Sequence, residues 1–250
     1  MKCMRVESAH TCASGGWYHF YGDSYKPPEF ERPEVARPSI DSDRLMQRFR
    51  SATGSFDYKR QAFSLGVNPT ALIALGAAWA SEYKAWAYPM RDGDGNTVGI
   101  RLRNDRGFKW AVKGSRQGVF MPSEGTSYGL MDIAYLPEGP TSTAALLSLG
   151  LYAIGRPSCS AGNDIVKAVL KRLGIHRAVI VSDNDTLKDF GGKQSRPGYE
   201  GALKLQRELG IKSTIWMPPS PLKDARDFMR KGGTKELIES DLRNRIWTKM

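Results

Sequence analysis

The sequence predicts an α/β protein in which a basic, β-rich region precedes a short parallel sheet flanked by helices. Near Lys84 the apolar pattern changes to extended segments separated by turn sequences such as DGDGN and NDRG, which predicts an antiparallel meander. From about residue 127 onward, apolar runs of strand length alternate with amphipathic segments of about ten residues. This alternation is typical of a parallel sheet that helices cover on both faces.

Four regions follow from these patterns along the chain. Residues 1–40 form an arm that is poor in periodic apolar residues and ends in a proline-rich linker. Residues 41–126 form the basic, β-rich subdomain, residues 127–233 the alternating region, and residues 234–250 a helical tail.

The basic subdomain is expected to begin with three short helices. Ser42 and Asn68 are candidate N-cap residues, Pro69 is well placed as a first helical residue, and Gly66 ends the second helix. The helices are expected over residues 43–52, 57–65 and 69–75, and the strands of the meander over 85–90, 97–104, 108–114 and 118–122.

The alternating region is expected to contain strands and helices in turn. The strands are expected over residues 131–137, 151–155, 177–182 and 212–217, and the helices over 142–150, 161–174, 197–210 and 223–233. Residues 191–193, with the sequence GGK, are expected to form a flexible loop.

The chain carries a strong positive charge that favours a polyanionic partner. Lys and Arg number 37 against 26 Asp and Glu, which gives a formal net charge of +11 and an isoelectric point of about 9.6. Cations that neutralise phosphates release condensed counterions, so such a surplus is typical of proteins that bind nucleic acid. The alternative is a basic surface that only keeps the protein dissolved.

Much of this charge lies in the meander. Eight Lys or Arg and three Asp lie between residues 84 and 120, a net charge of +5. Arg101 and Arg103 alternate with apolar residues, which on a strand places both guanidinium groups on one face. Such a face, with Trp110 among the lysines of the next segment, could hold a single strand or triphosphate oxygens. The alternative is a solvated face of a half-buried sheet.

Cysteine usage and hydropathy predict a cytoplasmic protein. The three cysteines, Cys3, Cys12 and Cys159, argue against a disulfide scaffold and fit a reducing compartment. No apolar run reaches the ~18 residues of a transmembrane helix, and residues 1–12 lack the apolar core of a signal peptide, so no membrane partner is expected. No G-x-x-x-x-G-K-[ST] pattern occurs, and therefore no helicase motor is expected in this chain.

Three carboxylates follow two of the predicted parallel strands, at the point where each strand ends. Glu138 comes after the strand MDIAYLP, and Asp183 and Asp185 lie in the run SDND after the strand RAVIVS. In open α/β sheets this edge binds ligands, and three neighbouring carboxylates repel one another unless a cation lies among them. Magnesium or manganese prefers such oxygen ligands. The alternative is that each acid is only a helix N-cap or a turn residue.

With these residues in place, the chain resembles a known family. The segments EGPTSTAALLSLGLYAIGRPSCSAG, AVIVSDND, PGYEGALKLQRELG and MPPSPLKDARDFM resemble, in order and spacing, the Toprim domain of primases, type IA and II topoisomerases and some nucleases. The preceding run WAYPMRDGDGNTVGIRLRNDRGFKWAVKGSRQGVFMP looks like the basic subdomain that precedes Toprim in primases. The likeness covers about residues 79–233 and is greatest for the primase half of phage primase-helicases and for Toprim proteins of mobile elements.

The resemblance implies a primase-like nucleotidyltransferase that uses Mg²⁺ or Mn²⁺, single-stranded DNA and nucleoside triphosphates. It implies cytoplasmic replication of a phage, plasmid or mobile element, alongside a separate replicative helicase. Glu138, Asp183 and Asp185 would be catalytic, and these three residues and Asp224 would hold the metal. The residues expected to contact template or nucleotide are Arg101, Arg103, Lys109, Lys113, Arg116 and, in the loop IGRPSCSAG, Arg156.

Two other functions stay open at this point. The same acids could position water, as in a Toprim nuclease, or the chain could be a non-catalytic DNA-binding module that recruits a replication partner. One departure from the family bears on this choice, because primases usually carry an aspartate four residues after the glutamate. Here that position is Ser142, whose hydroxyl is a neutral and weaker magnesium ligand.

The N-terminal arm contains a scattered set of residue types that can bind zinc: Cys3, His10, Cys12 and His19. In primases a zinc ribbon precedes the core, and GGWYHFYGD resembles the second half of that ribbon with both cysteines replaced. Structural zinc sites use paired ligands at short spacing, such as C-x₂-C, and the sequence has no such pair. We therefore expect a decayed or truncated ribbon and no bound zinc. The alternative for His10 and His19 is that each is an ordinary surface residue.

Overall fold

The computed structural model describes residues 2–3, 10–11, 17–18, 40–123, 132–190, 193–243, 245 and 247. The chain forms two compact units, Met1–Arg37 and Pro38–Met250. In the first unit, β1 (Lys2–Cys3) and β2 (His10–Thr11) pair antiparallel with the central strand β3 (Trp17–Tyr18). Of the predicted zinc-ligand set, Cys3 lies in β1 and His10 in β2, whereas Cys12 and His19 lie outside the described residues.

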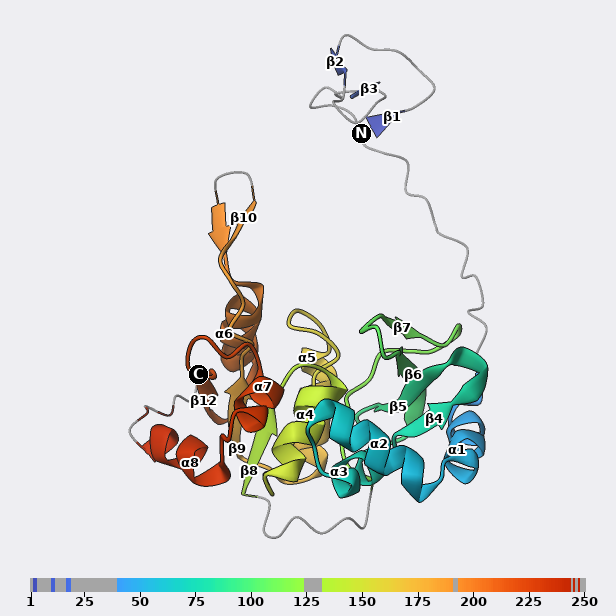
Figure 1. The fold of residues 1–250 in the computed structure, drawn as a ribbon. Helices are drawn as coiled ribbons and strands as arrows, with labels where there is room; N and C mark the ends of the chain where they lie inside the picture. The colour runs from blue at the N-terminus through green and yellow to red at the C-terminus, as the bar shows by residue number, and fades with distance from the viewer. Residues whose placement is uncertain are drawn as a thin grey trace. The chain divides into compact units, whose positions relative to one another are not determined.

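Three short helices and an antiparallel sheet open the second unit (Figure 1). The helices are α1 (Ser42–Ala52), α2 (Ser55–Leu65) and α3 (Pro69–Ala74). The sheet has the order β4-β5-β6-β7, with strands Ala78–Ala80, Ala85–Arg91, Thr97–Arg103 and Lys109–Ala111, and the 3-10 helix η1 (Ser81–Tyr83) joins the first two. The predicted helices and meander are confirmed, but the sequence pattern did not indicate β4, and residues 118–122 form isolated bridges rather than a strand.

The N-cap of α3 agrees with the sequence-based prediction, whereas the N-cap of α1 differs from it. The side chain of Asn68 accepts a hydrogen bond from the amide of Thr70 at 3.1 Å, and Pro69 is the first residue of α3, as predicted. The prediction for Ser42 was wrong, because Asp41 is the N-cap of α1 and accepts from the amide of Arg44 at 2.9 Å. A carboxylate at this position also interacts favourably with the helix dipole.

Three parallel strands form the second sheet, in the order β12-β9-β8. They are β8 (Ile133–Leu136), β9 (Arg177–Val181) and β12 (Lys212–Trp216). The helices of this half are α4 (Gly139–Ser148), α5 (Asn163–Arg172), α6 (Pro197–Leu209), α7 (Ala225–Arg230) and α8 (Lys235–Arg243). No helix among the described residues combines the length and the apolar character needed to cross a membrane.

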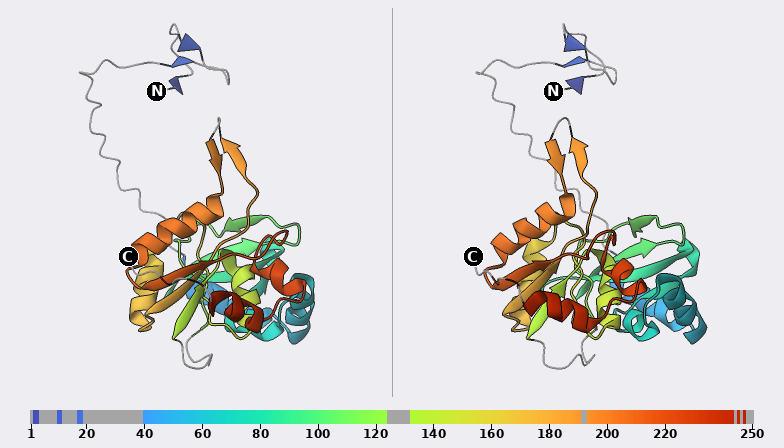
Figure 2. Two further views of the ribbon diagram at one scale, coloured as in Figure 1. Left: turned by 90° about the vertical axis from the view of Figure 1, so that its left-hand side faces the viewer. Right: turned by 60° about the vertical axis from the view of Figure 1, so that its left-hand side comes forward.

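Two segments of this half differ from the predicted elements. Residues 151–155 contribute isolated bridges instead of a strand, such as the parallel bridge of Ala153 with Tyr135. No strands were predicted over residues 188–195, where β10 (Lys188–Phe190) and β11 (Lys193–Ser195) pair antiparallel and extend away from the parallel sheet (Figure 2). Of the loop expected over residues 191–193, Lys193 is the first residue of β11, and residues 191–192 lie outside the described residues.

Alternate side chains of the parallel strands enter different hydrophobic cores. Ala178 and Ile180 of β9 pack in a cluster with residues of α5 and α6, on one face of the sheet. Val179 and Val181 pack in a cluster with residues of α4, α7 and α8, on the other face. This alternation with a period of two residues is what a strand buried on both faces requires.

The second of these clusters also joins the two sheets. Trp86, Tyr88 and Met90 of β5 belong to the same cluster as Ala144 and Leu147 of α4. The opposite face of the antiparallel sheet, which carries Ile100 and Leu102, packs against Met46 and Phe49 of α1. The antiparallel sheet is therefore held between α1 and the parallel half, and its position relative to the parallel sheet is set by a shared core.

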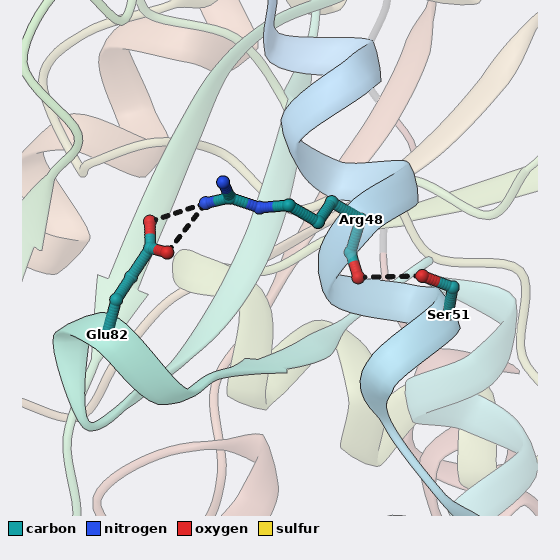
Figure 3. Close-up of polar contacts among 3 residues, drawn as sticks. All are labelled: Arg48, Ser51 and Glu82. Carbon is teal, nitrogen blue, oxygen red and sulfur yellow. Dashed lines mark hydrogen bonds and ion pairs between the residues drawn. The ribbon is translucent and has the colours of Figure 1, made fainter.

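A polar contact joins the outer side of α1 to η1 (Figure 3). The guanidinium of Arg48 donates to both carboxylate oxygens of Glu82, at 2.7 and 2.6 Å, and the hydroxyl of Ser51 donates to the carbonyl of Arg48 at 2.9 Å. The side chains of Arg48 and Glu82 are 60% and 46% exposed, so water screens their attraction. Burial of Met46, which is fully inaccessible, dominates the attachment of α1.

We expect Met46→Ala to lower the free energy of unfolding by about 2–5 kcal/mol, because a large side chain is removed from a closed core. Arg48→Ala should lower it by less than ~1 kcal/mol, because the ion pair is exposed. Urea unfolding followed by circular dichroism measures both values. Equal losses in the two variants would contradict this account of how α1 is held.

Candidate functional site

Two acid-bearing loops begin at the carboxyl ends of neighbouring parallel strands. β8 and β9 pair directly, in a register that aligns Leu136 with Ile180. Glu138 follows β8 and is the N-cap residue of α4, while Asp183 and Asp185 follow β9. The parallel pairing therefore brings the two loops to the same edge of the sheet, where α/β proteins commonly bind ligands.

The electrostatics of Asp183 show which acids lie around it. Burial raises the pKa of Asp183 to about 7, and the negative charges of Glu138, Asp224 and Asp185 add to this shift, in that order. The positive charge of Arg156 acts in the opposite direction and lowers the pKa of Asp183. The acidic edge, as we name these four residues (Glu138, Asp183, Asp185 and Asp224), is thus a group of interacting carboxylates.

Hydrogen bonds between two loops bring Asp224 to this group. The amide of Asn184 donates to the carbonyl of Lys223 at 2.7 Å, and its side-chain amide donates to the carbonyl of Leu222 at 3.2 Å. Asp224 then caps α7, with its carboxylate accepting from the amide of Asp227 at 2.8 Å. One cap interaction leaves carboxylate lone pairs free for another ligand.

Asp185 is positioned by the first turn of α6. Its Oδ2 accepts from the amide of Gly198 at 3.2 Å. A Cβ atom at position 198 would lie 3.0 Å from that oxygen and 3.1 Å from the carbonyl oxygen of Asp183. Only glycine therefore allows the helix to approach the acidic edge this closely without a shift.

The acidic edge fits an open magnesium site better than a closed metal cage. Its donors are carboxylate oxygens, which suit Mg²⁺ or Mn²⁺. Within the described residues, however, no three Asp, Glu, His or Cys side chains form a group that could hold a metal ion by themselves. Magnesium is often bound by one or two protein carboxylates, with waters and substrate phosphates completing its shell, so the donor set and the raised pKa of Asp183 fit such a site.

Arg156 lies beneath this edge rather than on its surface. Only 1% of the residue is exposed, and its guanidinium donates to the carbonyls of Leu136, Val181 and Cys159 at 3.2, 3.3 and 3.4 Å. The first two carbonyls end β8 and β9. The sequence-based prediction that Arg156 contacts phosphate is wrong, because its burial and these bonds leave no exposed face for that contact. We assign it instead to holding the two strand ends together.

One face of the antiparallel sheet carries Arg101, Arg103 and Lys109, and we name it the basic face. It faces the acidic edge. Arg103 pairs with Lys109 across β6 and β7, so both side chains lie on one face. Partial burial lowers the pKa of Lys109, Arg103 adds to that effect, and Glu138 and Asp183 raise it, so Lys109 interacts with the acids. Arg103 also donates to the hydroxyl of Thr141 in α4 at 3.3 Å.

The remaining predicted basic residues occupy different environments. Arg101 lies on the same sheet face as Arg103, and burial lowers its pKa. Lys113 and Arg116 are exposed in the segment that follows β7. Trp110 pairs with Leu102 and packs on the α1 side of the sheet, so it cannot be the aromatic of the basic face. The aromatic residues of that face include Trp86, opposite Arg103, its neighbour Trp79, and Tyr88, opposite Arg101.

Two further cations at the site were not singled out from the sequence. Burial lowers the pKa of Arg103, the positive charge of Arg226 in α7 lowers it further, and the negative charge of Asp224 raises it, so Arg103 interacts with both residues. Lys223 likewise lowers the pKa of Lys109. The run Lys-Asp-Ala-Arg at 223–226 is the signal that could have found them. Ser142, four residues after Glu138, is 3% exposed in the first turns of α4.

The fold is similar to those of solved primase structures. The E. coli primase catalytic core has a TM-score of 0.59 at 14% identity, with 82% of this chain and 79% of that chain covered. The zinc-binding and RNA polymerase domains of Aquifex aeolicus primase have a TM-score of 0.60 at 17% identity, covering 79% and 59% of the two chains. A DnaG primase catalytic domain bound to single-stranded DNA has a TM-score of 0.58 at 15% identity, covering 82% and 78%.

The chain has the fold of a primase catalytic core. No family model and no curated protein sequence matches the chain. The similarity to primases therefore rests on the comparison of structures. The Toprim-like half corresponds to the parallel sheet with its helices, and the expected α/β fold class is confirmed. At this level of identity, similarity establishes the fold, and function has to be argued from the site itself.

We expect Asp183→Asn to stabilise the metal-free protein at pH 8 by roughly 1 kcal/mol or more, because it removes a buried charge among like charges. The pKa of Asp183 is about 7 in the folded protein and near 4 in the unfolded chain. As the pH rises from 4 to 7, the unfolded chain loses the proton first, so the free energy of unfolding of the wild-type protein falls over this range. The gain should therefore vanish near pH 4. Thermal unfolding in EDTA at both pH values measures it, and equal effects at both would contradict the prediction.

We expect Arg156→Met to lower the free energy of unfolding by about 2–4 kcal/mol, because three carbonyls would lose their donor. Arg116→Met, at an exposed arginine, should change it by less than ~0.5 kcal/mol. Urea unfolding measures both. A stability loss below ~1 kcal/mol for Arg156→Met would show that Arg156 does not hold the strand ends.

Proposed function

We propose that this chain is a primase-type nucleotidyltransferase that joins nucleoside triphosphates on a single-stranded DNA template with a divalent metal ion. The observation that carries the proposal is the acidic edge facing the cations of the antiparallel sheet, Arg103 and Lys109. The fold likeness to primase cores supports it, and one of those structures is a primase domain bound to single-stranded DNA. In this assignment residues 41–126 are the template-binding subdomain, 127–233 the Toprim domain and 234–250 a tail.

The roles of the side chains follow from charge and position. Glu138, Asp183, Asp185 and Asp224 would hold Mg²⁺ or Mn²⁺, which would activate a 3′-hydroxyl and neutralise triphosphate charge. Arg103 and Lys109 would bind phosphate oxygens, since they are the cations that interact with the acids. Arg226 and Lys223 would add to this cationic wall, and Arg156 would hold the strand ends from below.

The proposed setting comes from the sequence resemblance. We place the protein in the cytoplasm, in replication of a phage, plasmid or mobile element. A separate helicase would supply the single-stranded template, since the chain contains no P-loop motif.

The binding-module alternative has one observation in its favour. Ser142 occupies the position of a usual carboxylate and is buried in α4, so this side chain adds no negative ligand to the site. A weaker metal site could leave nucleic-acid binding without synthesis.

We expect wild-type protein to incorporate labelled nucleotides into short products on single-stranded DNA in Mg²⁺ or Mn²⁺. Asp183→Asn and Glu138→Gln should each lower the rate on the order of 100-fold or more, because each removes a carboxylate from the metal site. Asp164→Asn is the matched control, because Asp164 is an exposed acid on α5 that pairs with Lys167. Gel analysis of the products measures the rates.

Two other outcomes would replace the proposal. Metal-dependent cleavage of the template, lost in Asp183→Asn, would assign a nuclease. No product in either metal with a helicase supplied, together with DNA binding that persists in Asp183→Asn, would assign a non-catalytic binding module.

A further inference from the structure

A continuous row of side chains crosses the antiparallel sheet on the face that meets the acidic edge. Trp79 pairs with Trp86, Trp86 with Arg103, and Arg103 with Lys109. Directly opposite residues share a face, so these four side chains project on the same side of β4, β5, β6 and β7. Three strand spacings of about 4.8 Å separate the ends of the row by ~14 Å. The row is aromatic at one end and cationic at the other, where it reaches the acids.

A pocket lies at the aromatic end of this row. Its volume is about 320 Å³, and it is lined by Arg60, Gln61, Ser64, Trp79, Trp86 and Asp105. This volume is near the lower limit of ligand sites, which span ~300–1,000 Å³, and it suits one flat ring system with its substituents. The pocket shares no lining residue with the acidic edge.

Contacts with neighbouring aromatic rings fix the tryptophan rings of the pocket. The ring of Trp86, 1% exposed, lies 5.5 Å from that of Tyr58 and 6.3 Å from that of Trp79, measured between centroids. The hydroxyl of Tyr58 donates to the carbonyl of Ala77 at 2.7 Å, which fixes that ring. Trp79 remains partly exposed. A rigid and partly exposed indole is a surface on which a nucleobase can stack at low entropic cost.

Polar groups of both kinds surround the rings. The side chain of Arg60 is 59% exposed, and its ion pair with Asp57 is long, at 3.7 Å. Asp105 is an exposed acceptor in the turn between β6 and β7, and Ser64 is also exposed. Donors and acceptors together match the edges of nucleobases, which present both.

We propose that this pocket binds one base of a single-stranded nucleic acid, whose sugar-phosphate backbone then passes over Arg103 and Lys109 toward the acidic edge. The net charge of +5 between residues 84 and 120 favours a polyanionic strand over a neutral ligand. This inference rests on the single-stranded partner of the proposed function but needs neither metal nor catalysis. Its failure can therefore be separated from failure of the synthesis assay.

The test measures fluorescence anisotropy of a labelled oligothymidylate of about 12 nucleotides in EDTA, over a range of salt. We expect Trp79→Leu to weaken binding about tenfold, since a base stack of that kind is lost, and Trp79→Phe to stay within about twofold of wild type. The dependence of affinity on salt should be unchanged in Trp79→Leu, whereas Lys109→Gln should lower its slope by about one.

Matched controls separate stacking from general damage. Trp110→Leu removes a partly buried tryptophan from the opposite face of the same sheet and should leave binding unchanged. Arg60→Gln, at the exposed rim, should weaken binding two- to threefold without touching the core, which keeps the test valid should Trp79→Leu unfold. Circular dichroism and thermal unfolding check that each variant is folded.

An oligonucleotide of the same length without bases decides whether a base occupies the pocket. Trp79→Leu should bind it as wild type does. The proposal fails if Trp79→Leu and Arg60→Gln both bind oligothymidylate as wild type does, or if Trp79→Leu loses affinity equally for the base-free strand. If only the binding of free mononucleotide, measured by competition, depends on Trp79, the pocket takes a nucleotide rather than a template base.

Discussion

The parallel pairing of β8 with β9, held by Arg156, is the constraint on which the candidate site depends. The two strands end side by side, and each is followed by acids. Gathering carboxylates costs free energy, as the raised pKa of Asp183 shows. Arg156 offsets part of that cost, because its buried guanidinium bonds the last carbonyls of both strands and places a fixed positive charge beneath the acids. A buried arginine needs such partners, so each side of this arrangement stabilises the other.

The shared hydrophobic core sets the second half of the site. Trp86 and Tyr88 of the antiparallel sheet pack in one cluster with α4 and with the parallel strands. Because the cationic residues lie on this same sheet face, the packing that buries the tryptophan also carries Arg103 and Lys109 to the acids. The cations of the antiparallel sheet therefore face the carboxylates of the acidic edge. That arrangement is suited to a ligand that combines phosphates with a divalent cation.

The site is less acidic than a purely carboxylate-lined one. Ser142 is neutral and buried, and Arg226 and Lys223 stand beside Asp224. A lower negative charge weakens the attraction for a free metal ion and strengthens the attraction for phosphate. Under the proposed function, the metal would therefore bind best together with a nucleotide or a strand.

The sequence by itself determined the local features of this protein. The change from a meander to alternating strands and helices, the position of Glu138, Asp183 and Asp185 after strands, and the shared face of Arg101 and Arg103 all follow from periodicities of a few residues. Only the tertiary structure decided features that depend on pairing between distant segments. These are the approach of Asp224, the burial of Arg156, the assignment of Trp110 to the far face, and the row from Trp79 to Lys109. Strand β4 belongs with them, because three residues carry too little pattern to predict a strand, and its neighbour β5 supplies the hydrogen bonds that define it.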